Sequence, residues 1–189
     1  MKLLRHSDFA IQPWKNGGGT TYEIARSPTD AASAKPQGEW DWRVSMAVIA
    51  SSGPFSHFDG VDRTLVMVEG EVSLLTTRGE NTLRPYDLIR FAGEEAITAS
   101  LRSSVARDLN VMVRRAWGNA KVSIEKTRAL IGPAVAIALG DMGALGETES
   151  LGTFGLDLHL YDALALENGE TAKLSGATPF LFAEFLMHA

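Results

Sequence analysis

Short stretches of alternating apolar and polar residues, separated by Gly, Pro and Asn-Gly, run through the whole 189-residue chain. In "WDWRVSMAV", Trp42, Val44 and Met46 share one face of an extended segment, and "ARDLNVMVRR" alternates in the same way. Such segments recur about every 8 to 15 residues, and no convincing helix longer than about three turns is present. This period-two pattern predicts an all-β sandwich or barrel.

The breaks between these segments predict turns and loops. "EGE" at 69–71 is typical of a turn or bulge inside a hairpin. Two stretches, 27–39 and 140–152, are rich in small residues, with Ser, Ala and Pro in the first and Gly in the second. We expect both to form surface loops.

Composition excludes several classes of function. The chain has no cysteine, which removes disulfides, thiolate metal sites and cysteine nucleophiles. The formal net charge is -5 and no basic block is present, so a nucleic-acid surface is not expected. "MKLLRHSDFA" is not a signal peptide, and no apolar stretch reaches the roughly 18 residues of a membrane span. We expect a soluble cytoplasmic protein without a membrane partner.

Five motifs carry a family resemblance. "PWKNGGGTT.EI", "WRVSMA", "GPFSHFDGVDRTL", "L.PYD..RFAGE" and "DLNVM.RR", in this order, resemble the HutD/Ves family of bicupins. They cover most of residues 1–115, whereas over 116–189 only the strand pattern and "YDALALENGE" are similar. The resemblance implies two cupin-like β-barrel modules of the RmlC-like jelly-roll type in one structural unit. The first, at 1–118, would hold the ligand site, and the second, at 119–189, would be degenerate.

The resemblance implies a role in ligand binding or regulation, including stress-related regulation, rather than a defined activity. Some family members are associated with histidine utilisation, and a small carboxylate such as formylglutamate is a suggested ligand. We therefore expect a small anionic metabolite as the partner. Whether the chain forms a homodimer stays open.

The metal motif of cupins is altered in this chain. Metal-binding cupins carry G-x5-H-x-H-x3–4-E-x6-G and then P-x-G-x2-H. If Gly70 is aligned with the closing glycine, Arg63 falls at the glutamate position and Arg90 at the last histidine. A guanidinium has no lone pair for a metal, but it binds carboxylates in a bidentate manner. Although His57 and Asp59 could still form a metal pair, we expect no metal and no cofactor.

The triple glycine at 17–19 has two interpretations. It lacks the Gly-Lys-Ser/Thr ending of a P-loop, and a strand-like pattern follows it. A glycine arm could approach a ligand and offer its N–H groups to an anion. Alternatively, it forms a tight turn that lets two strands pack closely. Asn16 and Thr20 favour the ligand role.

Other candidate residues also have more than one interpretation. Arg63 follows Asp62, so the two could form a local ion pair that fixes a turn. Arg43 is either a solvated strand residue or part of the barrel mouth. The face that carries Asp108, Asn110 and Met112 is too mixed for an outer surface, which favours the lining of a cavity.

The leading hypothesis is a protein that binds a small anion in the first barrel and has no catalytic residue. The alternative is a metal-independent cupin isomerase, epimerase or lyase, with Glu23, His57 or Asp108 as base. A module for protein interaction alone is a third option. The predicted ligand-binding residues are Trp14, Asn16, Gly17, Gly18, Gly19, Thr20, Arg43, Ser45, His57, Arg63, Arg90, Phe91, Asp108 and Asn110.

Overall fold

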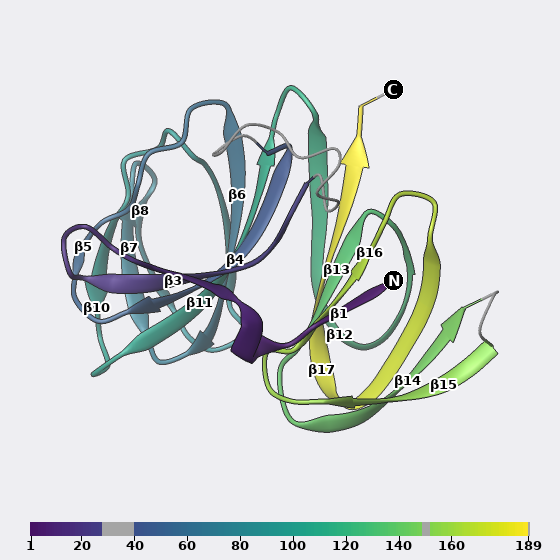
Figure 1. The fold of residues 1–189 in the computed structure, drawn as a ribbon. Helices are drawn as coiled ribbons and strands as arrows, with labels where there is room; N and C mark the ends of the chain where they lie inside the picture. The colour runs from purple at the N-terminus through teal and green to yellow at the C-terminus, as the bar shows by residue number, and fades with distance from the viewer. Residues whose placement is uncertain (28–39, 149–151, 189) are drawn as a thin grey trace. The chain divides into compact units, whose positions relative to one another are not determined.

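The computed structural model describes residues 1–27, 40–148 and 152–188 (Figure 1). The loop predicted over 27–39 therefore lies, apart from Ser27, outside the described residues. Among these, the only helical element is the single 3₁₀ turn η1 (His6–Asp8), and strands make up the regular structure. The all-β prediction is confirmed. No helix in the described ranges has the length and apolar character needed to cross a membrane.

The chain divides into two compact units, Ala10–Gly118 and Met1–Phe9 with Asn119–Ala189. The break between the two units falls after Gly118. The first nine residues, however, group with the C-terminal half. They do so because β1 (Lys2–Leu4) adds as an antiparallel strand to β16 (Ala163–Leu166).

The N-terminal unit contains an antiparallel sheet of six strands among the described residues. Its strands alternate in side-chain direction, so each contributes one face to the interior of the unit. In spatial order they are β2 (Ala10–Pro13), β3 (Gly19–Arg26), β4 (Trp42–Ile49), β11 (Ala106–Arg114), β6 (Val61–Glu69) and β9 (Leu88–Ala92).

A second sheet of four described strands packs against the first through a shared core. Its order is β5 (Gly53–Pro54), β10 (Thr98–Leu101), β7 (Val72–Thr76) and β8 (Gly79–Leu83). The core takes side chains from both sheets: Ile49, Leu65, Met67, Val72, Leu74, Leu83, Phe91, Ile97, Ala99 and Ala106. This apolar cluster is the interior of a barrel-like sandwich.

The turn predicted at 69–71 is present, but the hairpin is not. β6 and β7 meet at Gly70 and belong to different sheets, so the chain crosses from one layer to the other there. Gly70 has a φ of +74°. A Cβ at this position would overlap the backbone of Val105. The corner thus requires glycine for its conformation and for its close packing.

The C-terminal unit is built on a sheet of seven strands within the described ranges. The path runs β1, β16, β13 (Ala134–Ala138), β17 (Thr171–Met187), β14 (Met142–Thr148) and β15 (Gly152–Leu158), and β12 (Gly118–Ile131) also pairs with β17. Its core is the cluster Leu130, Ala134, Ala136, Ala138, Leu158, Leu164, Leu166, Ala172, Leu174, Phe180 and Phe182.

The loop predicted over 140–152 is wrong for the described part of this segment, and 149–151 lie outside the described residues. Most of this segment forms β14, which pairs with β15 on one side and β17 on the other. Glycine and polar residues disfavour a strand locally, but the backbone hydrogen bonds from two neighbouring strands override that preference.

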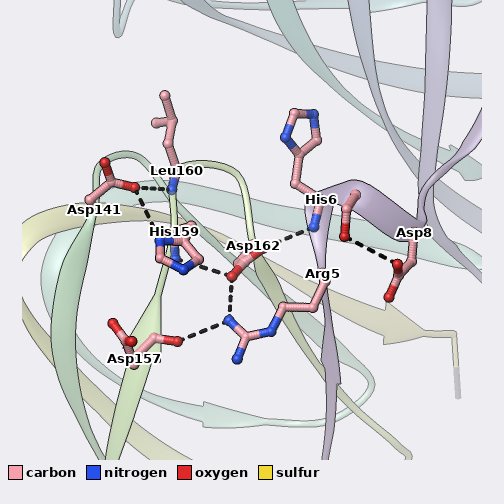
Figure 2. A network of polar contacts seen from close by, with 9 residues as sticks. Arg5, His6, Asp8, Asp141, Asp157, His159, Leu160 and Asp162 are labelled. Atoms are coloured by element: carbon pink, nitrogen blue, oxygen red, sulfur yellow. Dashed lines mark hydrogen bonds and ion pairs between the residues drawn. The ribbon is translucent and has the colours of Figure 1, made fainter.

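A buried carboxylate holds the first residues of the chain in the C-terminal unit (Figure 2). Asp162 is 2% exposed and accepts hydrogen bonds from Arg5 Nη1 at 2.6 Å and from the backbone N–H groups of His6 and His159 at 2.8 and 3.1 Å. Burial alone would raise the pKa of Asp162, but these hydrogen bonds outweigh it and lower the pKa. The ionised carboxylate therefore fixes the N-terminal segment at neutral pH.

Candidate functional site

The N-terminal unit contains a cavity of about 610 Å³. Three adjacent strands of the six-stranded sheet, β4, β11 and β6, supply its polar wall. This volume is within the range of ordinary small-molecule sites.

Strand register places the polar residues of this wall in rows. Met112 on β11 lies opposite Arg43 on β4 and opposite Arg63 on β6. Asn110 lies opposite Ser45, one step further along the strands. Asp108 lies opposite Ala47, one more step along. Because side chains two residues apart point to the same face, all of these residues line the cavity.

Two chain segments and Thr21 of β3 form the rest of the lining. One is the end of β2 with the turn that follows it, and the other runs from the end of β5 toward β6. The residues that these segments and β3 contribute are Gln12, Pro13, Trp14, Lys15, Asn16, Thr21, Pro54, Phe55, Ser56 and Phe58.

Arg63 is a buried cation on the cavity wall, with an exposed fraction of 6%. Its Nη1 donates to the carbonyl of Ser56 at 3.1 Å. Its guanidinium lies 4.9 Å from the ring centre of Phe91 and 5.4 Å from those of Phe55 and Phe58, within the range of cation–π attraction. Its Nε, also buried, has no hydrogen-bond partner in the described structure.

The local ion pair between Arg63 and Asp62 is absent from the described residues. Successive residues of β6 point to opposite faces, so Asp62 points away from the cavity and pairs with Arg115 at 2.7 Å. That interpretation of Arg63 is therefore wrong. Burial lowers the pKa of Arg63 to about 10; the charge of Asp108 opposes this effect and that of Arg43 adds to it. Arg63 remains a cation at neutral pH.

Arg43, the second arginine of the wall, already has a counter-ion. Its Nε donates to Glu23 Oε2 at 2.8 Å, and Glu23 also lies 3.5 Å from Arg26 Nε. Arg43 is half-buried and lines the cavity, so it is not the solvated strand residue that the sequence left open. Its charge is largely balanced inside the protein, unlike that of Arg63.

Asp108 and Asn110 contribute two buried acceptors without partners. Asp108 is 2% exposed and Asn110 is 8% exposed, and the Oδ1 atom of each has no hydrogen-bond partner in the described structure. Burial raises the pKa of Asp108 to about 7, although the positive charge of Arg63 lowers it. Buried polar atoms in native proteins nearly always have a partner. One donor and two acceptors of this wall thus have no hydrogen-bond partner within the described residues.

The glycines next to Trp14 have a packing role. Trp14 N–H donates to the carbonyl of Gly19 at 2.9 Å, and Gly18 N–H donates to Asn16 Oδ1 at 3.0 Å, which closes a tight turn between β2 and β3. A Cβ on Gly19 would overlap the Val48 carbonyl oxygen and lie 3.0 Å from the Trp14 ring. The turn therefore packs on β4 and holds Trp14 at the cavity, where its Nε1 donates to Thr21 Oγ1 at 2.8 Å.

We predict that Gly19→Ala lowers the free energy of unfolding by about 1–3 kcal/mol without any ligand, because the added methyl group overlaps backbone. Gly53→Ala is the control, since a Cβ there meets nothing within 4 Å. It should change stability by less than about 0.5 kcal/mol. Urea denaturation of both variants measures the difference. Equal stabilities of the two variants would show that the close packing of Gly19 does not contribute to stability.

Several residues of the predicted site lie outside the cavity lining. His57 is exposed, and its Nε2 lies 2.8 Å from Asp59 Oδ1. Arg90 is exposed on β9, and Phe91 is buried in the core, where it lies beside the lining residues Arg63 and Phe55. Thr20 and the three glycines are not part of the lining either. The lining does include Trp14, Asn16, Arg43, Ser45, Arg63, Asp108 and Asn110.

The predicted set of ligand-binding residues did not include the lining residues of the segment before Arg63. Phe55, Ser56 and Phe58 lie in the "GPFSHF" segment before Arg63, and their irregular backbone gave no periodic signal. Thr21 could have been found, because it lies opposite the lining residue Ala47 on the neighbouring strand. Among the described residues, no three His, Cys, Asp or Glu side chains gather where they could hold a metal ion.

The chain is similar in sequence to known proteins. The chain is 31% identical over 173 residues to an uncharacterised 21.2 kDa protein in the hutC 3' region of Pseudomonas putida, covering 90% of this chain and 88% of that one. It is 37% identical over 117 residues to protein Ves of Citrobacter koseri, covering 60% and 58% of the two chains.

The structure of HutD from Pseudomonas fluorescens SBW25 superposes with a TM-score of 0.83 at 23% identity, covering 100% of this chain and 99% of that one. At this identity the likeness shows the fold alone, which is that of the cupin proteins. The family model HutD matches residues 6–181. The chain therefore belongs to the HutD family.

Proposed function

We propose that the N-terminal unit binds a small organic anion, and that Arg63 holds its carboxylate. The observation that carries the proposal is the buried guanidinium of Arg63, whose Nε has no partner and which forms no ion pair within the described residues. Burial lowers the pKa of Arg63 and the charge of Asp108 offsets only part of this effect, so a carboxylate in contact with the guanidinium would stabilise its charge further. The aromatic rings beside Arg63 exclude water and strengthen the attraction.

The unpartnered acceptors define the rest of the ligand. Asn110 Oδ1 needs a hydrogen-bond donor, and Asp108 Oδ1 needs one as well. A plain dicarboxylate carries no donor, whereas an N-acyl or hydroxy acid does. The associations of the family with histidine utilisation make N-formyl-L-glutamate the first compound to test. Its amide N–H would face Asp108 or Asn110 while one carboxylate binds Arg63.

A binding or regulatory role fits the cavity better than catalysis does. Glu23 is engaged by Arg43, and His57 lies outside the lining, so Asp108 is the one carboxylate among the lining residues. Epimerisation by a two-base mechanism requires an acid and a base on opposite faces of the substrate, and Asp108 alone does not supply such a pair. A single acid–base group beside a cationic side chain supports binding of an anion, which a regulatory protein would sense.

We predict that N-formyl-L-glutamate raises the melting temperature. At 100 times its Kd it should add about 2.7 kcal/mol of stability by mass action. For a protein of this size that corresponds to roughly 5–10 °C. Differential scanning fluorimetry, with and without chelator, measures the shift. Glutarate, which lacks the donor, should give a smaller shift, and uncharged glutaramide should give none. If N-formyl-L-glutamate, 2-hydroxyglutarate and glutarate all leave the melting temperature unchanged, the proposed function is wrong.

A further inference from the structure

Asp108 and Arg63 are oppositely charged groups buried in the same cavity. Asp108 is 2% exposed, Arg63 is 6% exposed, and both line the wall formed by β11 and β6. Met112 separates them in the register, since it lies opposite Arg63 and four residues after Asp108 on β11. Each has one atom without a partner, Oδ1 of Asp108 and Nε of Arg63.

The other charged groups around Asp108 are balanced or exposed. On β4, Arg43 is paired with Glu23 of β3. On β11 itself, the neighbouring Arg107 is paired with Glu69 of β6 at 2.9 Å. The turn between β2 and β3 contributes Lys15, which is exposed. Arg63 on β6 is therefore the buried charge that favours the ionised form of Asp108.

We propose that the cavity binds its anion together with a proton, which Asp108 takes up when the anion occupies Arg63. This inference rests on the proposed function. An anion on Arg63 neutralises the charge that stabilises ionised Asp108 and adds a second negative charge to the same cavity. Two carboxylates in one buried site do not both stay ionised, so one of them is protonated. Protonated Asp108 can then donate a hydrogen bond to the anion.

The direction of the effect follows from linkage. In the free protein, burial raises the pKa of Asp108 to about 7 in spite of Arg63. The anion raises that pKa further. Below pH 7 Asp108 is already protonated and the affinity is highest. Above pH 7 the affinity falls, by up to about tenfold per pH unit, until the pKa of the complex is reached.

Isothermal titration calorimetry with N-formyl-L-glutamate tests this between pH 6 and 9 in buffers of different ionisation enthalpy. The compound's own carboxylic acids titrate near pH 4, far from this range. We expect the wild-type protein to take up as much as one proton per anion at pH 8. Asp108→Asn should take up none and bind with an affinity that does not change with pH. Asp62→Asn, which alters an exposed carboxylate outside the cavity, should keep the wild-type linkage.

An affinity of the wild-type protein that is flat with pH, or equal proton uptake by Asp108→Asn, would overturn the inference. The absence of any binding heat would instead count against the proposed function, and a measurement without ligand then decides. Carboxyl ¹³C NMR of the free protein should show that Asp108 titrates near pH 7, at a higher pH in Arg63→Gln and near the wild-type value in Arg63→Lys. Titration near pH 4 in both wild type and Arg63→Gln would exclude the coupling.

Discussion

Asp108→Asn is expected to stabilise the free protein by up to about 4 kcal/mol at pH 8. Burial raises the pKa of this carboxyl to about 7, and that value already includes the attraction of Arg63. A folded-state pKa above the unfolded one means that ionisation opposes folding. Asparagine keeps the shape of the side chain and removes the charge.

The gain in stability of Asp108→Asn should increase with pH. At pH 4 Asp108 is protonated in the folded state and about half protonated in the unfolded state, so the variant should differ little from wild type. The difference grows as the pH rises from about 4 to about 7 and is constant above that. Urea denaturation at pH 4 and pH 8 measures it, with Asp62→Asn as the matched control. A variant that is no more stable than wild type at pH 8 would show that Asp108 is well solvated or fully paired.

Arg63→Lys is expected to weaken binding of N-formyl-L-glutamate by about ten- to a hundredfold. Lysine keeps the positive charge but loses the planar fork and its stacking on phenylalanine rings. The loss of one charge-assisted hydrogen bond corresponds to about 1.5–3 kcal/mol. Arg90→Lys is the control, because Arg90 is exposed and lies outside the cavity lining. Its affinity should equal that of wild type.

At position 63, lysine tests the contact with the anion more specifically than alanine does, because the side chain of Arg63 is buried. Its guanidinium is buried among Phe55, Phe58 and Phe91, so Arg63→Ala would remove packing together with charge. The melting temperature of Arg63→Lys without ligand shows whether the fold persists. Unchanged affinity in a folded Arg63→Lys variant would place the anion elsewhere, at Arg43 or Lys15.

The sequence by itself determined the class of fold and the composition of one cavity wall. Alternation of apolar and polar residues has the period of a strand, and that local property predicted the all-β architecture. The same alternation placed Asp108, Asn110 and Met112 on one face of β11, and the structure has all three in the lining. Arginine at a position expected for a metal ligand predicted that Arg63 binds an anion.

Only the tertiary structure decided which residues meet at the cavity. Register between strands brings Arg43, Met112 and Arg63 into one row, and the burial of Arg63 depends on rings from separate segments. Arg90 and Arg63 both fit the sequence argument, yet one is exposed and the other buried. The pairing of β14 likewise depends on strands distant in sequence. Strand register and burial are set by contacts between distant segments, and a local pattern carries no information about those contacts.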